Sequence, residues 1–199
     1  MTDFEQYSLL VGALSSLATF LVVLIAIAGE WIRQQWNSPQ LRINLTEPSF
    51  NITTDGIRGW YYLIRVANAN KSAPAKNVRI LLIKTYKKAP DGSWCEHIFS
   101  GPTQVSWRWP EWSPLYSTVG PDEWATFGSL LENAEFNIRL YWYPNNLQPA
   151  IRRNDPTRLQ FKAVSDTAES NILTVEVAWD GNWVEDRSEI KKHLIVKTV

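Results

Sequence analysis

The stretch QYSLLVGALSSLATFLVVLIAIAG, residues 6–29, divides this chain into two parts, because its 24 residues include no charged side chain. The hydrocarbon core of a bilayer is about 30 Å thick and requires about 20 mostly apolar residues to be crossed as a helix. No other part of the chain has apolar sequence of that length. We therefore predict a transmembrane helix over about residues 7–29, within a membrane anchor at residues 1–36.

Three other kinds of segment share this apolar character. A secretory signal peptide is the first, since Ala26 and Ala28 imitate its cleavage site, but Asp3 and Glu5 stand where it requires positive charge. A buried core helix shows a polar stripe, and an interfacial helix shows a strongly charged face. Polar side chains within residues 8–28 are only Ser8, Ser15, Ser16 and Thr19. This pattern favours the membrane span.

The flanks and small residues of this segment add detail. Tyr7 stands at one end and Trp31 and Trp36 at the other, where aromatic rings favour the headgroup layer. Gly12 and Ser16 are four residues apart, as in helix contacts between small residues in membranes. We predict helix self-association through Gly12 and Ser16.

Positive charge predicts the orientation in the bilayer. No Lys or Arg precedes the apolar stretch, whereas Arg33 and Arg42 follow it. The positive-inside rule then places the N-terminus outside and the remaining chain in the cytoplasm. Cys95 is the single cysteine, so no disulfide can form within one chain.

Beyond a linker at residues 37–40, residues 41–199 have the composition of one β domain. Short runs rich in β-branched and aromatic residues alternate with turn residues such as Asp55-Gly56 and Asp180-Gly181. The predicted strands are residues 41–45, 59–67, 77–86, 94–99, 104–109, 124–131, 136–143, 158–164, 172–179 and 193–199. Only residues 186–193 predict a short helical turn.

Alternation within the strands predicts how they pack. In LTVEVAW, residues 173–179, every second residue is apolar, and FNIRLYW, residues 136–142, repeats the pattern. One-sided burial of this kind indicates antiparallel sheets that face a shared core. We predict a mainly β fold with one antiparallel sandwich, although a barrel with a similar number of strands would give much the same pattern.

Several motifs resemble those of immunoglobulin-like sandwiches. Residues 60–66 followed by Asn68 resemble a strand that ends in V-x-N, and residues 72–80 resemble the turn and strand that follow it. Val119-Gly120-Pro121 looks like an entry to a strand midway through such domains. The ending, LTVEVAWDGNW and then HLIVKTV, resembles that of uncharacterised bacterial single-pass membrane proteins with this C-terminal domain. The resemblance covers most of residues 41–199 and implies no functional residue. The chain lacks the paired cysteines of antibody domains.

Composition argues against several classes of function. The 20 basic residues balance the 20 acidic ones, whereas nucleic-acid binding without sequence preference needs a marked basic excess. Phosphate-binding glycine loops and hydrolase motifs are absent from the sequence, and two His with one Cys cannot build a closed zinc site. Cys95 and His97 would share one strand face, but no third group orients them. We expect no enzyme activity, no cofactor and no nucleic-acid partner.

Tryptophan is the unusual residue, with 11 in the chain. Several lie close together in the sequence, so they predict either core packing or an exposed platform that stacks on a ligand or a partner. The candidate binding residues are Trp94, Trp107, Arg108, Trp109, Glu111 and Trp112. A further group of acidic residues predicts either a site for a hard cation such as Ca²⁺ or the negative charge that is usual near a helix N-terminus. Its members are Asp180, Glu185, Asp186 and Glu189.

These observations predict a membrane-anchored, non-catalytic binding or scaffold protein, whose partners are the bilayer and a protein, a ligand or a second copy. The alternative is a sensor–effector, for example in bacterial stress or phage defence, in which the β domain receives a signal and drives helix self-association. A concave site with convergent polar groups would favour the sensor, whereas a scaffold can be flat.

Overall fold

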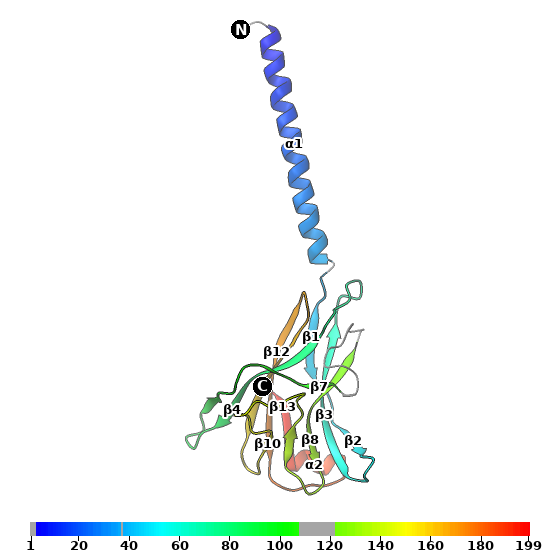
Figure 1. Cartoon of the computed structure of the whole chain (residues 1–199), viewed down its shortest axis with the longest axis vertical. Coiled ribbons are helices and arrows are strands. Elements are labelled where there is room, and N and C mark those ends of the chain that lie inside the picture. The colour runs from blue at the N-terminus through cyan, green and yellow to red at the C-terminus, as the bar shows by residue number, and fades with distance from the viewer. Residues whose placement is uncertain (1–2, 37, 108–121) are drawn as a thin grey trace. The chain divides into compact units, whose positions relative to one another are not determined.

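The computed structural model describes residues 3–36, 38–107 and 122–199, and the chain divides into two compact units. The first unit, Met1–Ser38, contains one helix, α1 (Asp3–Trp36). The second unit, Pro39–Val199, contains all the described strands (Figure 1).

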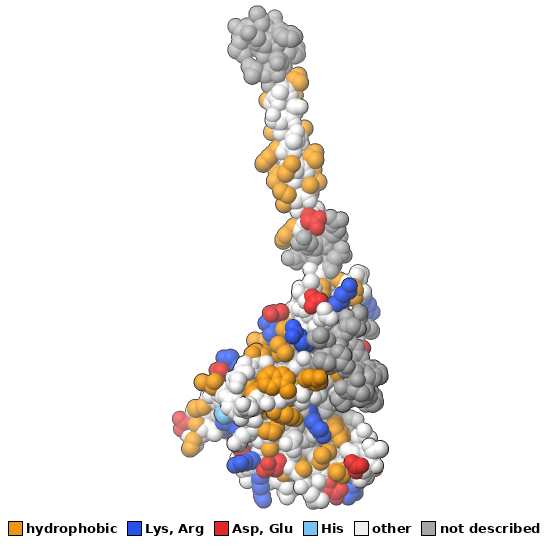
Figure 2. Space-filling model, in the orientation of Figure 1, with side chains coloured by type: hydrophobic (Ala, Val, Ile, Leu, Met, Phe, Trp, Pro, Cys, Tyr) orange, Lys and Arg blue, Asp and Glu red, His pale blue; other side chains and the backbone are white. Residues whose placement is uncertain are grey.

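Helix α1 has the length and the composition that a membrane span requires. Its segment Val11–Trp31 has 21 residues, is strongly apolar and buries none of its side chains in the structure. A rise of 1.5 Å per residue extends 21 residues over about 32 Å, close to the thickness of a bilayer core. Hydrophobic side chains lie along the visible face of this part of the helix (Figure 2). The predicted apolar helix is confirmed.

The strands of the second unit form two antiparallel sheets, which confirms the mainly β class. The first sheet contains β1 (Leu41–Leu45), β2 (Ser49–Ile52), β3 (Arg58–Asn68), β7 (Ser106–Trp107), β8 (Glu123–Leu131), β9 (Phe136–Ile138) and β10 (Ala150–Ile151). The second contains β4 (Arg79–Lys88), β5 (Trp94–His97), β6 (Thr103–Gln104), β11 (Thr157–Val164), β12 (Glu169–Trp179) and β13 (Leu194–Thr198). The main strand orders are β1-β3-β8-β9-β10 and β13-β12-β11-β4-β5.

The core lies between the two sheets because apolar side chains alternate along the strands. On β12, Leu173, Val175, Val177 and Trp179 are all buried, as their spacing predicts. Rings from opposite sheets meet in the middle: Phe127 of β8 and Phe161 of β11 pack edge to face at 5.3 Å between centroids. The domain is therefore a sandwich of two sheets.

The chain passes from one sheet to the other where the sequence predicts a single strand at residues 104–109. Strand β6 pairs with β4 of the second sheet, but β7 pairs with β8 of the first. Val105 lies between them and donates its backbone N–H to Ile80 O (2.8 Å). The alternation of residues continues through this crossing, so the sequence pattern does not reveal the change of sheet.

A second predicted strand, residues 136–143, is shorter in the structure. Strand β9 ends at Ile138, and Trp142, expected on the buried face, is 50 % exposed. The chain folds back after β9, and the Tyr143 hydroxyl donates to Ile138 O across this turn (2.9 Å). Strands β2 and β10 are not predicted, since four and two residues are too few for a pattern to register.

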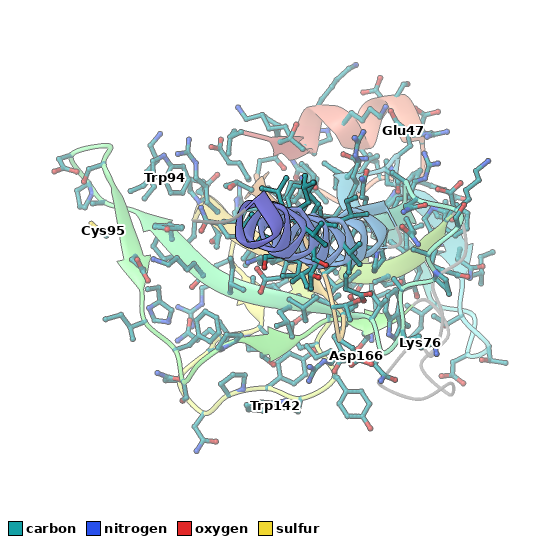
Figure 3. All side chains as sticks on the ribbon, turned by 90° about the horizontal axis from the view of Figure 1, so that it is seen from above. Glu47, Lys76, Trp94, Cys95, Trp142 and Asp166 are labelled. Atoms are coloured by element: carbon teal, nitrogen blue, oxygen red, sulfur yellow. The ribbon has the colours of Figure 1, made fainter. Side chains whose placement is uncertain are left out.

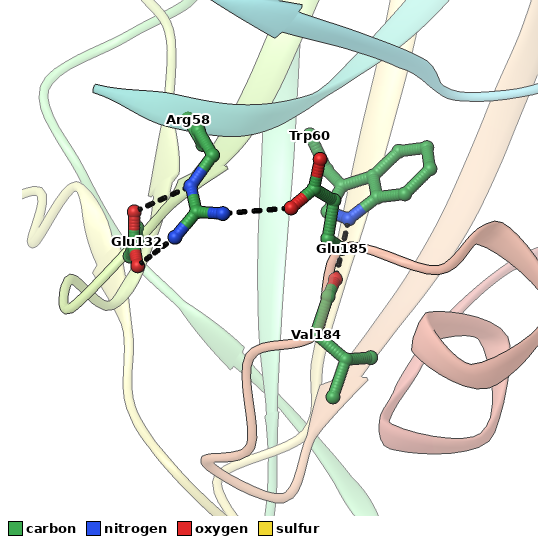
Figure 4. A network of polar contacts seen from close by, with 5 residues as sticks. All are labelled: Arg58, Trp60, Glu132, Val184 and Glu185. Carbon is green, nitrogen blue, oxygen red and sulfur yellow. Dashed lines mark hydrogen bonds and ion pairs between the residues drawn. The ribbon is translucent and has the colours of Figure 1, made fainter. Parts of the chain in front are cut away.

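Polar contacts close one end of the sandwich (Figure 4). Arg58 of β3 donates two hydrogen bonds to Glu132 (3.0 and 2.7 Å) and one to Glu185 (2.7 Å). Nearby, Trp60 Nε1 donates to Val184 O (2.9 Å). These bonds join the first sheet to the loop between β12 and helix α2 (Arg187–His193). The predicted helical turn at 186–193 is confirmed by α2.

Two Asn side chains hold the region around β1. Asn68 is buried, and its side chain accepts from Gln40 N (3.0 Å) and Asn70 N (3.1 Å) and donates to Ala73 O (2.6 Å). The V-x-N motif therefore ends β3 with a turn held by an amide side chain.

The second side chain, Asn171 of β12, continues the hydrogen-bonding ladder at the free edge of β1. Its Oδ1 accepts from Ile43 N (3.1 Å), and its Nδ2 donates to Ile43 O (3.2 Å). Because β12 belongs to the second sheet, this contact joins the two sheets.

Candidate functional site: a cavity on the outer face of the first sheet

A cavity of about 800 Å³ lies on the first sheet, and its position follows from the alternation of β3. Trp60, Tyr62 and Ile64 point into the core, so Tyr61 and Leu63 point outward. The described lining comes from β2, the turn after it, β3, β7, β8 and the segment that follows β9. It consists of Ser49, Asn51, Ile52, Thr53, Thr54, Tyr61, Leu63, Ser106, Trp107, Thr126, Arg139, Leu140 and Tyr143.

Hydroxyl groups and one cation dominate the polar part of this lining. Arg139 is the only charged residue among the described lining residues. Its Nε donates to the hydroxyl of Ser129 (2.9 Å), and Ser129 is only 1 % exposed. Aromatic surface comes from Tyr61, Trp107 and Tyr143. The volume falls within the range of about 300–1,000 Å³ that is usual for small-molecule sites.

The wall formed by Tyr143 is fixed by its own hydrogen bonds. Its hydroxyl donates to Ile138 O (2.9 Å) and accepts from Leu140 N (3.4 Å). The fold-back after β9 thus brings Tyr143 to the cavity beside Arg139. The same turn leaves Tyr141 and Trp142 more than 45 % exposed outside it.

A second, smaller crevice of about 380 Å³ opens between β1 and β13. The buried Tyr62 lines it, and burial, followed by the negative charge of Glu47, raises the pKa of the Tyr62 phenol. At its rim Glu47 accepts hydrogen bonds from Lys191 (2.8 Å) and Arg187 (3.1 Å) of α2. The bond and charge of Lys191, and then the bond from Arg187, lower the pKa of Glu47. Figure 3 shows Glu47 beside α2.

The structure separates the tryptophans that the sequence groups together. Trp107 lies on β7 in the first sheet, is 3 % exposed and lines the cavity while also packing into the core. Trp94 lies on β5 in the second sheet, where the Arg158 guanidinium stacks on its ring at 4.0 Å. Trp94 and Cys95 lie on the β4–β5 hairpin (Figure 3). Trp94 and Trp107 therefore do not form one exposed platform.

The other predicted binding residues, Arg108, Trp109, Glu111 and Trp112, lie outside the described residues. Their role in binding stays a prediction. On α1, Gly12 and Ser16 are exposed, and the Ser16 hydroxyl donates to Gly12 O (2.9 Å). Self-association through that face also stays a prediction.

Cys95 and His97 are both exposed on β5, and His97 Nε2 donates to Asn146 O (3.2 Å). Within the described ranges, no group of three or more His, Cys, Asp or Glu side chains is arranged to hold a metal.

The four acidic residues that the sequence groups each have a polar partner. Asp186 caps α2 by accepting from Ser188 N and Glu189 N, and hydrogen bonds from Ser188 lower its pKa most. Glu185 pairs with Arg58, and Glu189 pairs with Lys192. Burial raises the pKa of Asp180, but hydrogen bonds from His193 and Asn182 outweigh it and leave the pKa lowered. These carboxylates are explained by ordinary capping and pairing.

The cavity itself was not predicted from the sequence. One signal was present, because β3 carries large side chains on both faces: Tyr61 and Leu63 outward, Trp60 and Tyr62 inward. Leu63 points outward, yet its exposed fraction is only 6 %. The outer face of the first sheet is therefore covered at this position. Comparison of the chain with protein-family models, curated proteins and solved structures gives no match, so the function is inferred from these residues alone.

Proposed function

We propose that this chain is a membrane-anchored, non-catalytic binding protein whose sandwich receives a small ligand in the cavity on the first sheet. The cavity carries the proposal, because hydroxyls, an arginine and aromatic rings from separate strands converge on it. Helix α1 would cross the bilayer, with the sandwich in the cytoplasm. A bound ligand would then be held near the membrane surface.

The strand order supports an immunoglobulin-like architecture. The central orders β1-β3-β8 and β12-β11-β4-β5 are similar to those of such domains, in which the chain alternates between two sheets. In this chain the short strand β7 pairs with β8. The loops of such sandwiches cluster at their two ends, whereas this cavity lies on the outer face of one sheet.

The test is to ask whether the cavity is occupied after purification. The full chain is isolated in a mild detergent beside Thr126→Trp, in which an indole fills the cavity from β8. Small molecules released by denaturation are identified by mass spectrometry. We expect at least one molecule that co-purifies in near-stoichiometric amount with the wild type and is lost from Thr126→Trp. Equal small-molecule content in the two proteins would contradict the assignment, provided that both show the same near-UV circular dichroism.

The cavity also favours a second function, a sensor–effector in which ligand binding changes the association of α1. Gly12 has no neighbouring atom within 4 Å of an added Cβ, so Gly12→Leu leaves the helix itself undisturbed. We expect Gly12→Leu to reduce ligand-dependent oligomers in mass photometry. Ala18→Leu is the matched control, since 100° per residue places Ala18 about 120° around the helix from Gly12 and about 160° from Ser16. Identical oligomers with and without the cavity ligand would leave only the binding function.

A further inference from the structure

Backbone hydrogen bonds to two strands hold the main chain of Arg139 beside the cavity. Arg139 N donates to Phe127 O of β8 (2.8 Å), and Arg139 O accepts from Ser106 N of β7 (3.2 Å). The residue is therefore held between β7 and β8 although it lies beyond the end of β9. Its side chain extends over the outer face of the first sheet, where the Ser129 hydroxyl accepts from Nε (2.9 Å).

Arg139 differs from the arginines of the sandwich that form ion pairs. Arg58, Arg65, Arg158 and Arg187 each form an ion pair with a carboxylate at 3.1 Å or less. Arg139 forms no such pair in the described part of the chain, and its single side-chain hydrogen bond there uses Nε. Among the described residues, Nη1 and Nη2, with four N–H donors, therefore keep their capacity for a ligand.

The surroundings of Arg139 favour an anion. The described lining contains no Asp or Glu, so nothing there neutralises the guanidinium. Hydroxyls of Ser49, Ser106 and Thr126 add donors around the same space. Partial burial excludes water and strengthens a charge-assisted bond, and the guanidinium fork matches the oxygens of carboxylates and phosphates.

The size and the apolar walls indicate more than an inorganic ion. A volume of about 800 Å³ greatly exceeds that of a bare phosphate, and Tyr61, Leu63 and Trp107 form apolar surface along it. Aromatic faces of this kind pack against flat or ring-shaped groups. Hydrogen-bond donors around Arg139, with apolar side chains beside them, fit a molecule that has an anionic group attached to an apolar organic group.

We infer that the cavity binds a small organic anion, a carboxylate or phosphate ester, whose charged group is held by Arg139. Ser129 accepts a hydrogen bond from Arg139 and is not part of the described lining. This inference rests on the proposed function and adds the chemical class of the ligand to it.

Binding is measured on the full chain in dodecyl maltoside, a detergent with no charged headgroup, by isothermal titration and ligand-observed NMR. Phenyl phosphate and benzoate are compared with their neutral partners benzyl alcohol and benzamide. A short-chain phosphatidylglycerol is added as a separate probe, to distinguish a lipid headgroup from a free anion. The variants are Arg139→Gln, Arg139→Lys and, as matched control, Arg79→Gln, an exposed arginine of the second sheet.

We expect each anion to bind at least about tenfold more tightly than its neutral partner. Arg139→Gln should lower the affinity for each anion by about tenfold or more. Arg139→Lys keeps the charge but loses the fork, so its affinity should lie between those of wild type and Arg139→Gln. Arg79→Gln should bind as wild type does. Preference for the phospholipid over phenyl phosphate would support the same anion site with a lipid as its source.

Two results would overturn the inference, and only the second would also contradict the proposed function. If neutral and anionic partners bind equally and Arg139→Gln binds like wild type, the cavity is a ligand site without selectivity for anions. If no probe binds and the purified protein carries no small molecule, both the inference and the proposed function are wrong. The comparison of charged and neutral probes uses the wild type, so it holds even where Arg139→Gln does not fold.

Discussion

At the scale of single residues, Asn68 shows how much of this fold depends on a buried amide. Three hydrogen bonds from one side chain fix the chain before β1 and the turn after β3. Replacement by Ala would leave these backbone groups without that partner in a buried place.

We expect Asn68→Ala to lower the free energy of unfolding by about 2–4 kcal/mol. Near-UV circular dichroism during urea unfolding of the full chain in detergent reports the loss of packing in the sandwich. Asn44→Ala, at an exposed position of β1, is the control and should change the midpoint little. Equal midpoints for the two variants would show that the amide bonds are unimportant.

Gly128 of β8 lies against an aromatic ring, and this contact sets the residue type. An added Cβ would lie 2.2 Å from Cζ of Phe136, closer than atoms can approach. Gly128→Ala should destabilise the sandwich by about 1–3 kcal/mol, because the buried Phe136 must shift. The double variant with Phe136→Leu should lose less than the sum of the single variants, and strict additivity would argue against the contact.

The residues of the candidate site were difficult to predict for a physical reason. Arg139 stands on the polar face of an alternating run, where the sequence pattern indicates a solvated side chain. Its role depends on Ser129 and Ser106, which the β7–β8–β9 pairing brings beside it. Such proximity arises from register between strands, and one strand's pattern contains no information about its neighbour.

At the scale of elements, the sequence predicts the long strands well and the short ones poorly. Strand β1 has the predicted bounds, and β8 and β11 begin one residue earlier than expected. Alternation over many residues gives a strong signal, whereas β2, β10 and the crossing at Val105 involve too few residues. Helix α1 is the clearest element, because apolar length alone indicates it.

Sheet strands also make stability depend on pH. Glu176 of β12 is bound by Arg158 (2.9 Å) and Lys197 (3.4 Å) on neighbouring strands. Burial raises its pKa, but the Arg158 hydrogen bond and the Lys197 charge outweigh burial, so the pKa lies below the ordinary 4.5. A carboxyl with a lowered folded-state pKa stabilises the fold above its unfolded pKa, and that stabilisation is lost as the pH falls through the folded value.

We therefore expect the urea midpoint to be constant above about pH 6 and to decrease toward about pH 3. Glu176→Gln should show a smaller decrease over the same range. Glu135→Gln changes an exposed carboxyl in a turn and should keep the wild-type profile. Parallel profiles for wild type and Glu176→Gln would show that this carboxylate makes no contribution.

At the scale of the whole molecule, the single cysteine provides a direct test of orientation. Cys95 is exposed on β5, and no second cysteine competes with it. If the sandwich is cytoplasmic, a membrane-impermeant maleimide should label Cys95 only after the cells are permeabilised. Thr2→Cys combined with Cys95→Ser should give the opposite pattern. Labelling of Cys95 in intact cells would place the sandwich outside.

The bonds between Asn171 and Ile43 have a consequence for biosynthesis. They join positions 128 residues apart, so the edge of β1 stays unpaired until β12 has been made. Domains built from such distant contacts fold slowly, because the closure of long loops precedes the contacts that stabilise them. Strand β1 is synthesised long before β12, yet this edge of β1 is completed only when β12 is present. The nascent chain thus carries an open strand edge until β12 is synthesised, and an open edge can pair with another chain and aggregate.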